Sequence, residues 1–342
     1  MHKNPPLLQA EQHPRPERIV AFDVLKCFAI YLMLWAHGIQ HLTTADCVDN
    51  PVYRWIYSFH MPLFMMVSGY FSVKSMHLSF GKFTGKKLKQ IALPGFVWPW
   101  VFALIGVVFF SGSFHFSTNI LSYIPYWFLK ALLICNLLAY IGNKFKYGLF
   151  VTLLVSQVIP FANVIYMYPA FVLGQTMGNN KDWFKSNIKL ILICSAAIYF
   201  ISLLFWGADD WHLMTQTQEM QVTSGLAKAG VFYIEKTVYK LIVNLSGSVM
   251  FFGLFMLLEK LWDNCFGRFM GFMGKYTLIV YILQCHILEE NLPKYVNLDN
   301  LATPVLNFVA TPAIALGVLL FSVGVAALVD KNKYTRLLLL GR

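Results

Sequence analysis

The first apolar segment of the chain, residues 21–41, carries three ionisable side chains: Asp23, Lys26 and His37. About 20 apolar residues are enough to cross a bilayer, and ionisable groups inside such a span are costly, so they mark a binding or proton-handling site. Lys26 and His37 are eleven residues apart. At 3.6 residues per turn a helix places both on one face, roughly 16 Å apart. Asp23 shares that face and can pair with Lys26.

This spacing suits a reaction across a membrane. A phosphorylated carrier would dock on Lys26 near the cytoplasmic boundary, and a pantetheine-sized arm would carry its reactive end about 16 Å along the helix to His37. Imidazole titrates near neutrality, so His37 could take the proton from an attacking hydroxyl. Two structural interpretations stay open: Lys26 could snorkel to the inner interface, and His37 could form a hydrogen bond between helices.

Other segments carry further candidates. His60 lies near the outer end of the second apolar segment and His286 near the outer end of the ninth. Both could shape an acceptor site, although His60 alone is better explained as a structural residue. Glu235 lies in the eighth segment, where it either lines the acceptor cavity or pairs with a lysine. Lys86 and Lys89 precede the third segment as a candidate phosphate site, a topology signal or an anionic-lipid contact.

The composition predicts a polytopic membrane protein. Of 342 residues, 58% are hydrophobic and 13% are charged, whereas a soluble domain has roughly 25% charged residues. A net charge of +11 could suggest nucleic acid, but cytoplasmic loops of membrane proteins are rich in Lys and Arg, so we expect no nucleic-acid partner. The six cysteines show no CxxC pair and no His/Cys ligand spacing. We therefore expect neither a metal site nor a disulfide framework.

The predicted fold class is all-α: a polytopic membrane helical bundle with about ten transmembrane helices. Residues 1–20 are expected to form a cytoplasmic tail, 21–329 a transmembrane domain and 330–342 a second cytoplasmic tail. Basic residues gather in alternate loops, which predicts that both termini are cytoplasmic. The ten expected segments are residues 21–41, 53–73, 91–111, 121–141, 148–159, 161–178, 188–206, 234–258, 271–289 and 304–328.

The ordered motifs of this chain resemble acyltransferase family 3, a family of integral membrane acyltransferases. That family opens with a basic residue, ten intervening residues and a histidine, as Lys26 to His37 do here. HMPLFMMVSGYF resembles its second span, KKLKQIALP its third-span entry, WFL a later aromatic segment and GKYTLIVYILQCH its penultimate span. These blocks are in the family's order and spread across most of the chain.

The resemblance implies transfer of an acyl group, usually from acetyl-CoA on the cytoplasmic side, to a hydroxyl of a cell-envelope polysaccharide or lipid-linked glycan. It implies that His37 is the catalytic base and that Lys26, Lys86 and Lys89 bind the donor. Trp127 of the WFL segment is expected at the acceptor site. The family more often has Arg at the basic positions, and Lys keeps the charge but loses bidentate phosphate geometry.

A different class, a transporter or flippase for a glycan or its precursor, would also need a polar cavity. The chain shows no duplicated halves, which weighs against many transporter folds. The expected partners are therefore acyl-CoA, a glycan acceptor and the lipids of the cytoplasmic membrane. A homo-oligomer, the choice of acyl group and direct transfer versus an acyl-enzyme are left open.

Overall fold

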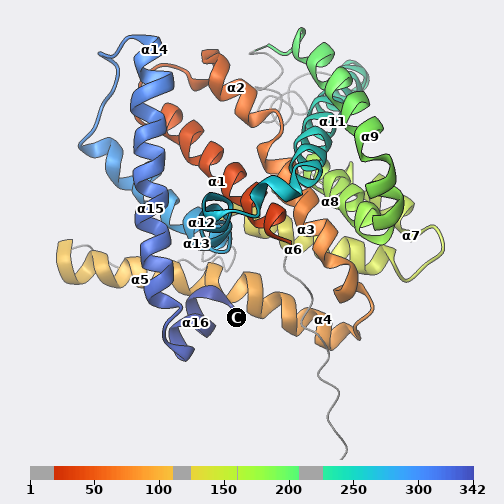
Figure 1. Cartoon of the computed structure of the whole chain (residues 1–342), viewed down its shortest axis with the longest axis horizontal. Helices are drawn as coiled ribbons and strands as arrows, with labels where there is room; N and C mark the ends of the chain where they lie inside the picture. The colour runs from red at the N-terminus through yellow and green to blue at the C-terminus, as the bar shows by residue number, and fades with distance from the viewer. Residues whose placement is uncertain (1–18, 111–124, 160, 208–225) are drawn as a thin grey trace, which may run out of the picture.

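The computed structural model describes residues 19–110, 125–159, 161–207 and 226–342, and every regular element in these ranges is helical (Figure 1). Three helices contain or adjoin a π-helical turn: η2 (Leu88–Ala92), η5 (Cys285–Asn291) and η7 (Leu306–Ala310). The α-helices are α1 (Val20–His41), α2 (Pro51–Tyr57), α3 (His60–Met76), α4 (Phe80–Lys87), α5 (Leu93–Phe110), α6 (Trp127–Gly142), α7 (Gly148–Ser156), α8 (Val164–Asn179), α9 (Lys181–Leu203), α11 (Leu226–Leu257), α12 (Cys265–Gly274), α13 (Thr277–Gln284), α14 (Thr303–Val305), α15 (Thr311–Val329) and α16 (Lys333–Leu340).

Five helices in the described ranges are long and apolar enough to cross a membrane, and a sixth span results if α12 and the following helix, bent by 59°, count as one. The all-helical class is thus confirmed, whereas ten spans are not. The expected span 53–73 is divided into α2 and α3 at Ser58–Phe59. The expected segments at 148–159 and 161–178 contain helices of 9 and 16 residues, which are short for a full crossing.

Helix α1 is the central helix of the bundle. In Figure 1 it lies between α15 and α3, with α12 and α13 beside it, and all four pack against it. In its most apolar stretch 67% of the residues are buried, against 17% for α9. A helix that is apolar and enclosed on most sides belongs to the interior of a bundle, whereas α9 turns most of its surface outward. The bundle therefore surrounds the ionisable residues of α1 with protein.

Helices α3 and α8 approach each other closely. A Cβ atom added at Gly69 would overlap the carbonyl oxygen of Phe171, and one at Gly174 would overlap that of Met66. Small residues let helix backbones approach closely in membranes. Gly69 and Gly174 therefore allow α3 and α8 to pack backbone against backbone.

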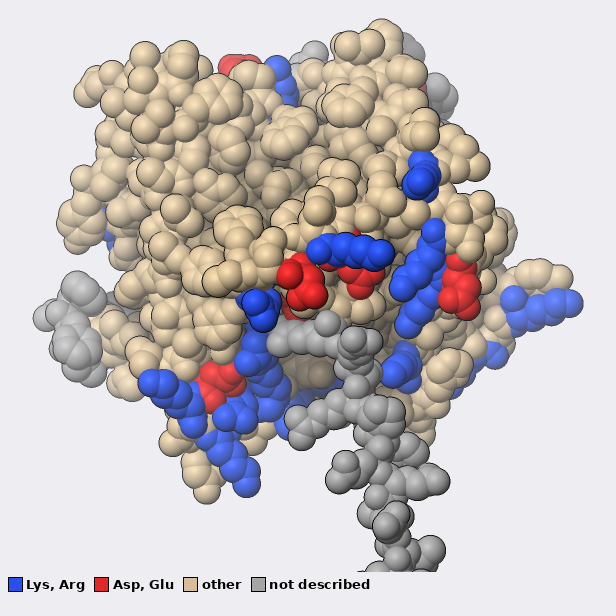
Figure 2. Space-filling model, in the orientation of Figure 1, with Lys and Arg blue, Asp and Glu red and all other residues tan. Residues whose placement is uncertain are grey.

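The C-terminal residues form a docked helix rather than an extended tail. The Asp330 carboxylate forms ion pairs of 3.1 Å with each of Lys275, Arg336 and Arg342. It also accepts a hydrogen bond of 2.9 Å from the Tyr276 hydroxyl. Figure 2 shows Lys and Arg gathered in the lower part of this face, where α16 and α4 lie, while the upper part is largely uncharged. Residues 1–18 of the expected N-terminal tail lie outside the described residues.

Candidate active site

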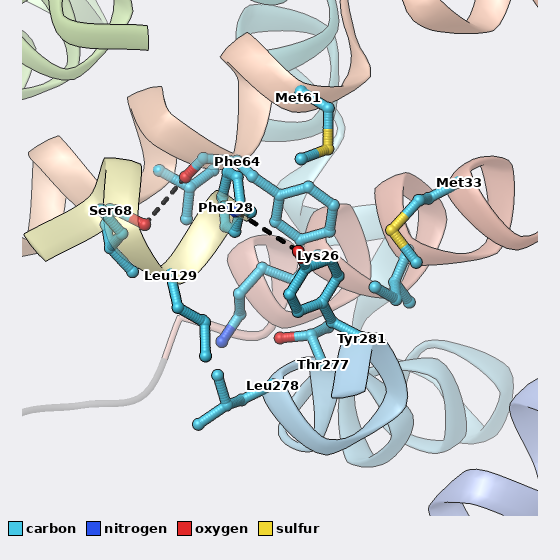
Figure 3. A pocket seen from close by; sticks show the side chains of 13 residues that line it. Lys26, Met33, Met61, Phe64, Ser68, Phe128, Leu129, Thr277, Leu278 and Tyr281 are labelled. Carbon is cyan, nitrogen blue, oxygen red and sulfur yellow. Dashed lines mark hydrogen bonds between the residues drawn. The ribbon is translucent and has the colours of Figure 1, made fainter. Parts of the chain in front are cut away.

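Two cavities lie along α1, one lined by Lys26 and the other by His37. The first, here called the inner cavity, has a volume of about 130 Å³ and is mainly apolar. Figure 3 shows its side chains, which come from α1, α3, α6 and α13. They are Lys26, Ile30, Met33, Met61, Phe64, Val67, Ser68, Phe128, Leu129, Leu132, Thr277, Leu278 and Tyr281.

Lys26 is the one charged side chain among these described lining residues. Its Nζ lies 2.6 Å from Oδ1 of Asp23, as the spacing of three residues predicts. In Figure 3 the amine points towards Leu129 and Leu278. The ion pair offsets much of the cost of a lysine beside an apolar cavity. The lysine side chain keeps 26% of its surface exposed, so it remains accessible from the cavity.

Asp23 also faces a third cavity of about 230 Å³. Arg268 and Lys275 line it, and Gly271 and Gly274 let α12 pack directly on this part of α1. An added Cβ at Gly274 would overlap the carbonyl oxygen of Asp23. Cationic side chains at this end can attract phosphate groups.

The second cavity, here called the outer chamber, has a volume of about 360 Å³ and a more polar lining than the inner cavity. It is formed by the ends of α1, α2 and α6 together with α13 and η5. Its lining residues are His37, Gln40, His41, Tyr53, Tyr57, Pro125, Tyr126, Trp127, Asn163, Tyr281, Cys285, His286, Glu289 and Glu290.

His37 is held from both ring nitrogens in the outer chamber. Its Nδ1 lies 3.2 Å from Oε1 of Glu289, within ion-pair distance although not aligned as a full hydrogen bond. Its Nε2 lies 3.1 Å from the Tyr57 hydroxyl. The carboxylate favours the tautomer with the proton on Nδ1, which leaves Nε2 as a proton acceptor. The Tyr57 oxygen therefore marks a position from which a hydroxyl can give its proton to His37.

Glu289 is itself positioned by its neighbours. The side-chain amide of Gln284 donates a hydrogen bond of 3.0 Å to Glu289 Oε1. The π-helical turn η5 carries the glutamate from α13 to the outer end of α1. π-helical turns inside α-helices are frequently found at functional sites.

His41 completes a cluster with His37 and Glu289. The two imidazole rings are stacked with centroids 5.5 Å apart. One ligand-type atom from each of the three residues lies within 4.8 Å of the others, a spacing that could hold a metal ion. The same groups can share a proton, because an imidazole nitrogen can donate or accept one and a carboxylate can accept one. The geometry is thus compatible with a cation as well as with general-base chemistry.

His286 and Trp127 also line the outer chamber. The Nδ1 of His286 lies 2.7 Å from Glu290 and its Nε2 3.2 Å from the Tyr126 hydroxyl, while Phe102 packs against its ring. Aromatic rings beside carboxylates can contact the faces and hydroxyls of a polar substrate. Of the four residues expected at an acceptor site, His286 and Trp127 therefore lie in the same chamber as His37.

Four other expected site residues lie outside both cavities. His60 is fully buried, with Nδ1 2.8 Å from the Ile56 carbonyl and its ring against Tyr57, so it lies behind the chamber wall. Lys86 and Lys89 are exposed at the end of α4 and in η2, and Glu235 is exposed on α11. None of the four lines the inner cavity or the outer chamber.

Three site residues were not anticipated: Glu289, Tyr57 and Tyr281. Glu289 is the last residue of the ninth expected segment, 271–289. Its position three residues after His286 was an available signal, because residues three apart share a helix face. For Tyr57 and Tyr281 the sequence holds no comparable signal, since both contact His37 or the cavities through long-range packing.

Comparison with known proteins identifies a family model and two relatives that match the chain. A family model described as an acyltransferase domain matches residues 19–330. The chain is 29% identical to the nodulation protein NolL of Sinorhizobium fredii over 57% of this chain and 59% of that protein. It is 26% identical to NolL of Mesorhizobium japonicum over 78% of this chain and 76% of that protein. No solved structure matches the chain.

Proposed function

The chain belongs to the acyltransferase-domain family and is an acyltransferase, and we propose that it is a membrane O-acyltransferase with His37 as general base. The donor is cytoplasmic acyl-CoA, with acetyl the expected acyl group. The acceptor is a hydroxyl of a cell-envelope polysaccharide or of a lipid-linked glycan. Family membership favours this enzyme over a transporter of the same glycan.

One observation carries the proposal. His37 lies in a polar chamber between a carboxylate and a hydroxyl, and Lys26 faces an apolar cavity at the other end of the same helix. Eleven residues of helix separate the two by roughly 16 Å. A narrow apolar cavity suits the pantetheine arm and acyl group, while a wider polar chamber suits a glycan.

The donor phosphates have candidate partners at the inner end. Lys86 and Lys89 are exposed there, and Arg268 lines the cavity beside Asp23. Ammonium groups bind phosphate as point charges and guanidinium groups as bidentate donors. We place the phosphates among these cations, and Lys26, already paired with Asp23, at the entry of the arm.

The transfer step follows from the geometry of His37. The acceptor hydroxyl takes the position of the Tyr57 hydroxyl and gives its proton to Nε2 while its oxygen attacks the thioester carbon. The tetrahedral intermediate collapses as the carbon–sulfur bond breaks, and the imidazolium returns the proton to the leaving CoA thiolate. Glu289 stabilises the imidazolium that forms between the two steps, and no acyl-enzyme is required.

The test is the variant His37→Ala, compared with His77→Ala, a histidine exposed at the end of α3. Loss of a general base lowers rates roughly 10²- to 10⁴-fold. CoA release from acetyl-CoA, together with mass spectrometry of envelope glycans, measures the effect in purified protein and in cells. We expect the first variant to lose transfer and the second to keep it. Full activity of His37→Ala would overturn the mechanism. Loss of activity of the parent protein on treatment with a chelator would instead indicate that His37, His41 and Glu289 hold a metal ion.

A further inference from the structure

The inner cavity and the outer chamber meet at Tyr281. Of the described residues that line either space, Tyr281 is the one that lines both. The chain crosses from one space to the other at the start of α6, where Trp127 lines the chamber and Phe128 the inner cavity. An aromatic wall thus stands between the space beside Lys26 and the space beside His37.

The ring of Tyr281 is held in this wall by α6. The backbone N–H of Phe128 donates a hydrogen bond of 3.3 Å to the Tyr281 hydroxyl. This N–H belongs to the first turn of the helix, where donors lack partners inside the helix. The rings of Phe128 and Tyr126 lie 5.7 and 6.0 Å from that of Tyr281, and Tyr281 is 6% exposed. Phe64 packs against Phe128 from α3.

Among the described residues the Tyr281 hydroxyl has one hydrogen bond, and its length of 3.3 Å lies just beyond the usual N–H···O range of 2.7–3.2 Å. The hydroxyl accepts from a neutral donor rather than from a charged group. Such a bond can break and reform readily, because water or a substrate hydroxyl can replace it. The Tyr281 ring therefore separates the two spaces in the structure, and a weak hydrogen bond from the Phe128 N–H holds its hydroxyl in place.

We propose that Tyr281 is a movable partition between the donor and acceptor spaces. In its closed position it keeps water of the polar chamber away from a thioester waiting in the apolar cavity. The ring turns aside when the acyl group moves up to His37, so that transfer to the glycan is favoured over hydrolysis. The role in transfer rests on the proposed function, whereas the separation of the two spaces does not.

A native cysteine allows the partition to be tested without any activity measurement. Cys285 lines the outer chamber, while Cys27 and Cys135 are buried. Replacing Cys47, Cys194 and Cys265 with serine leaves Cys285 as the accessible thiol. A small charged methanethiosulfonate added to the cytoplasmic side of inside-out vesicles then reports passage through the inner cavity.

We expect Tyr281→Ala to raise the rate of Cys285 modification from the cytoplasmic side at least about tenfold. Tyr281→Phe keeps the ring and should raise it only slightly. The matched control is Tyr31→Ala, since Tyr31 also bonds a backbone group, the Pro312 carbonyl, but lines neither space. Equal modification rates in the parent and in Tyr281→Ala would overturn the partition. Size-exclusion chromatography checks that each variant is folded.

A second measurement separates the partition from the proposed function. In the absence of glycan, acetyl-CoA hydrolysis should be slow in the parent and severalfold faster in Tyr281→Ala, while transfer to glycan falls. A different outcome is that Tyr281→Ala speeds Cys285 modification while no protein, including the parent supplied with glycan, releases CoA. That result would support the partition and overturn the acyl-CoA proposal. Unchanged hydrolysis in a variant that transfers normally would overturn the role of Tyr281 in protecting the thioester.

Discussion

At the scale of single residues, the His37 imidazole is positioned by two neighbours that belong to other helices. Glu289 faces Nδ1 of His37 and Tyr57 faces Nε2. A histidine held from one side by a carboxylate presents the other nitrogen in a fixed direction. In the proposed mechanism the role of His37 as a base therefore depends on this arrangement rather than on the histidine alone.

The first prediction concerns this carboxylate. Glu289→Gln keeps the size of the side chain and the contact with Gln284 but removes the charge that stabilises the imidazolium. We expect the rate of acyl transfer to fall about 10²-fold, the lower range of general acid–base contributions. The initial rate of CoA release in purified protein measures this change.

Asp299→Asn is the matched control for the loss of an acidic charge at the outer end. Asp299 is fully exposed and bonds the backbone and hydroxyl of Thr44 rather than a histidine. Its substitution should leave the transfer rate within about twofold of the parent, as is usual for surface changes. Equal rates for Glu289→Gln and the parent would show that His37 works without the carboxylate.

The sequence could predict Lys26 and His37 because both lie on one helix, where spacing alone determines which side chains share a face. It could not predict that Glu289 faces His37, because that contact joins α1 to η5 across the bundle. Nor could it show that His60 is turned away from the chamber, since the orientation of its ring depends on the Ile56 carbonyl and on Tyr57. For such residues the structure shows which side chains line the cavities, which the sequence alone does not.

At the scale of elements, the site depends on how closely α3 packs on α8. Gly174 faces the Met66 carbonyl with no space for a side chain, and α3 also carries Met61 and Phe64 of the inner cavity. We predict that Gly174→Val destabilises the protein, because overpacking costs about 1–3 kcal/mol or more where the obstacle is backbone. Thermal unfolding in detergent, followed by tryptophan fluorescence, measures the loss.

Gly317→Val is the control for the same change in an exposed helix. Gly317 lies on α15, and an added Cβ meets nothing within 4 Å. Its substitution should shift the unfolding temperature little, apart from the small difference in helix propensity. Equal shifts for the two variants would indicate that the close approach of α3 and α8 contributes no stability.

Hydropathy predicted the apolar segments better than their bends. The first expected segment, 21–41, agrees with α1 within a residue. The ninth, 271–289, is instead bent by 59° between Gly274 and Thr277. The residues in the bend, Lys275 and Tyr276, bond Asp330 after α15. An average of hydropathy over neighbouring residues cannot predict the contact of Lys275 and Tyr276 with Asp330, because Asp330 lies more than 50 residues further along the chain.

The Asp330 cluster also gives a pH prediction. Burial would raise the pKa of Asp330, but hydrogen bonds from Tyr276 and Lys275 and the charge of Arg342 outweigh it and lower the pKa. A lowered carboxyl pKa stabilises the fold above the ordinary value of about 3.9, and this contribution is lost as the pH falls through the folded-state pKa. The docking of α16 should therefore persist at neutral pH and be lost only in acid.

A nitroxide on Leu338→Cys, an exposed position of α16, reports this docking by electron paramagnetic resonance. We expect an immobile label at neutral pH in the parent and a mobile label in Asp330→Asn at every pH. Asp263→Asn, at an exposed acid after the 3₁₀-helical turn η4 (Glu259–Trp262), is the control. An immobile label in Asp330→Asn would mean that apolar contacts, such as that of buried Leu340, hold α16 without the carboxylate.

At the scale of the whole molecule, the charges and the two cavities define a direction. The Asp330 cluster and the basic residues near α4 and α16 lie at the end of the bundle that contains Lys26 and Asp23. The outer chamber lies at the opposite end of α1. Lys and Arg accumulate on the cytoplasmic side of membrane proteins. The donor would thus enter from the side on which CoA is available, and the glycan from the other.

This direction predicts which thiols react from each side of the membrane. Cys265 is exposed at the start of α12, near the basic end, and Ala45 is exposed after the outer end of α1. An impermeant maleimide should label Cys265 in inside-out vesicles and Ala45→Cys, in a background without Cys265, in intact cells. Labelling should be absent in the opposite preparations, because about 30 Å of hydrocarbon separates the two faces. The reverse pattern would place the outer chamber on the cytoplasmic side, so that the glycan acceptor would have to be modified before export. Labelling of both sites from one face would mean that α1 does not cross the membrane.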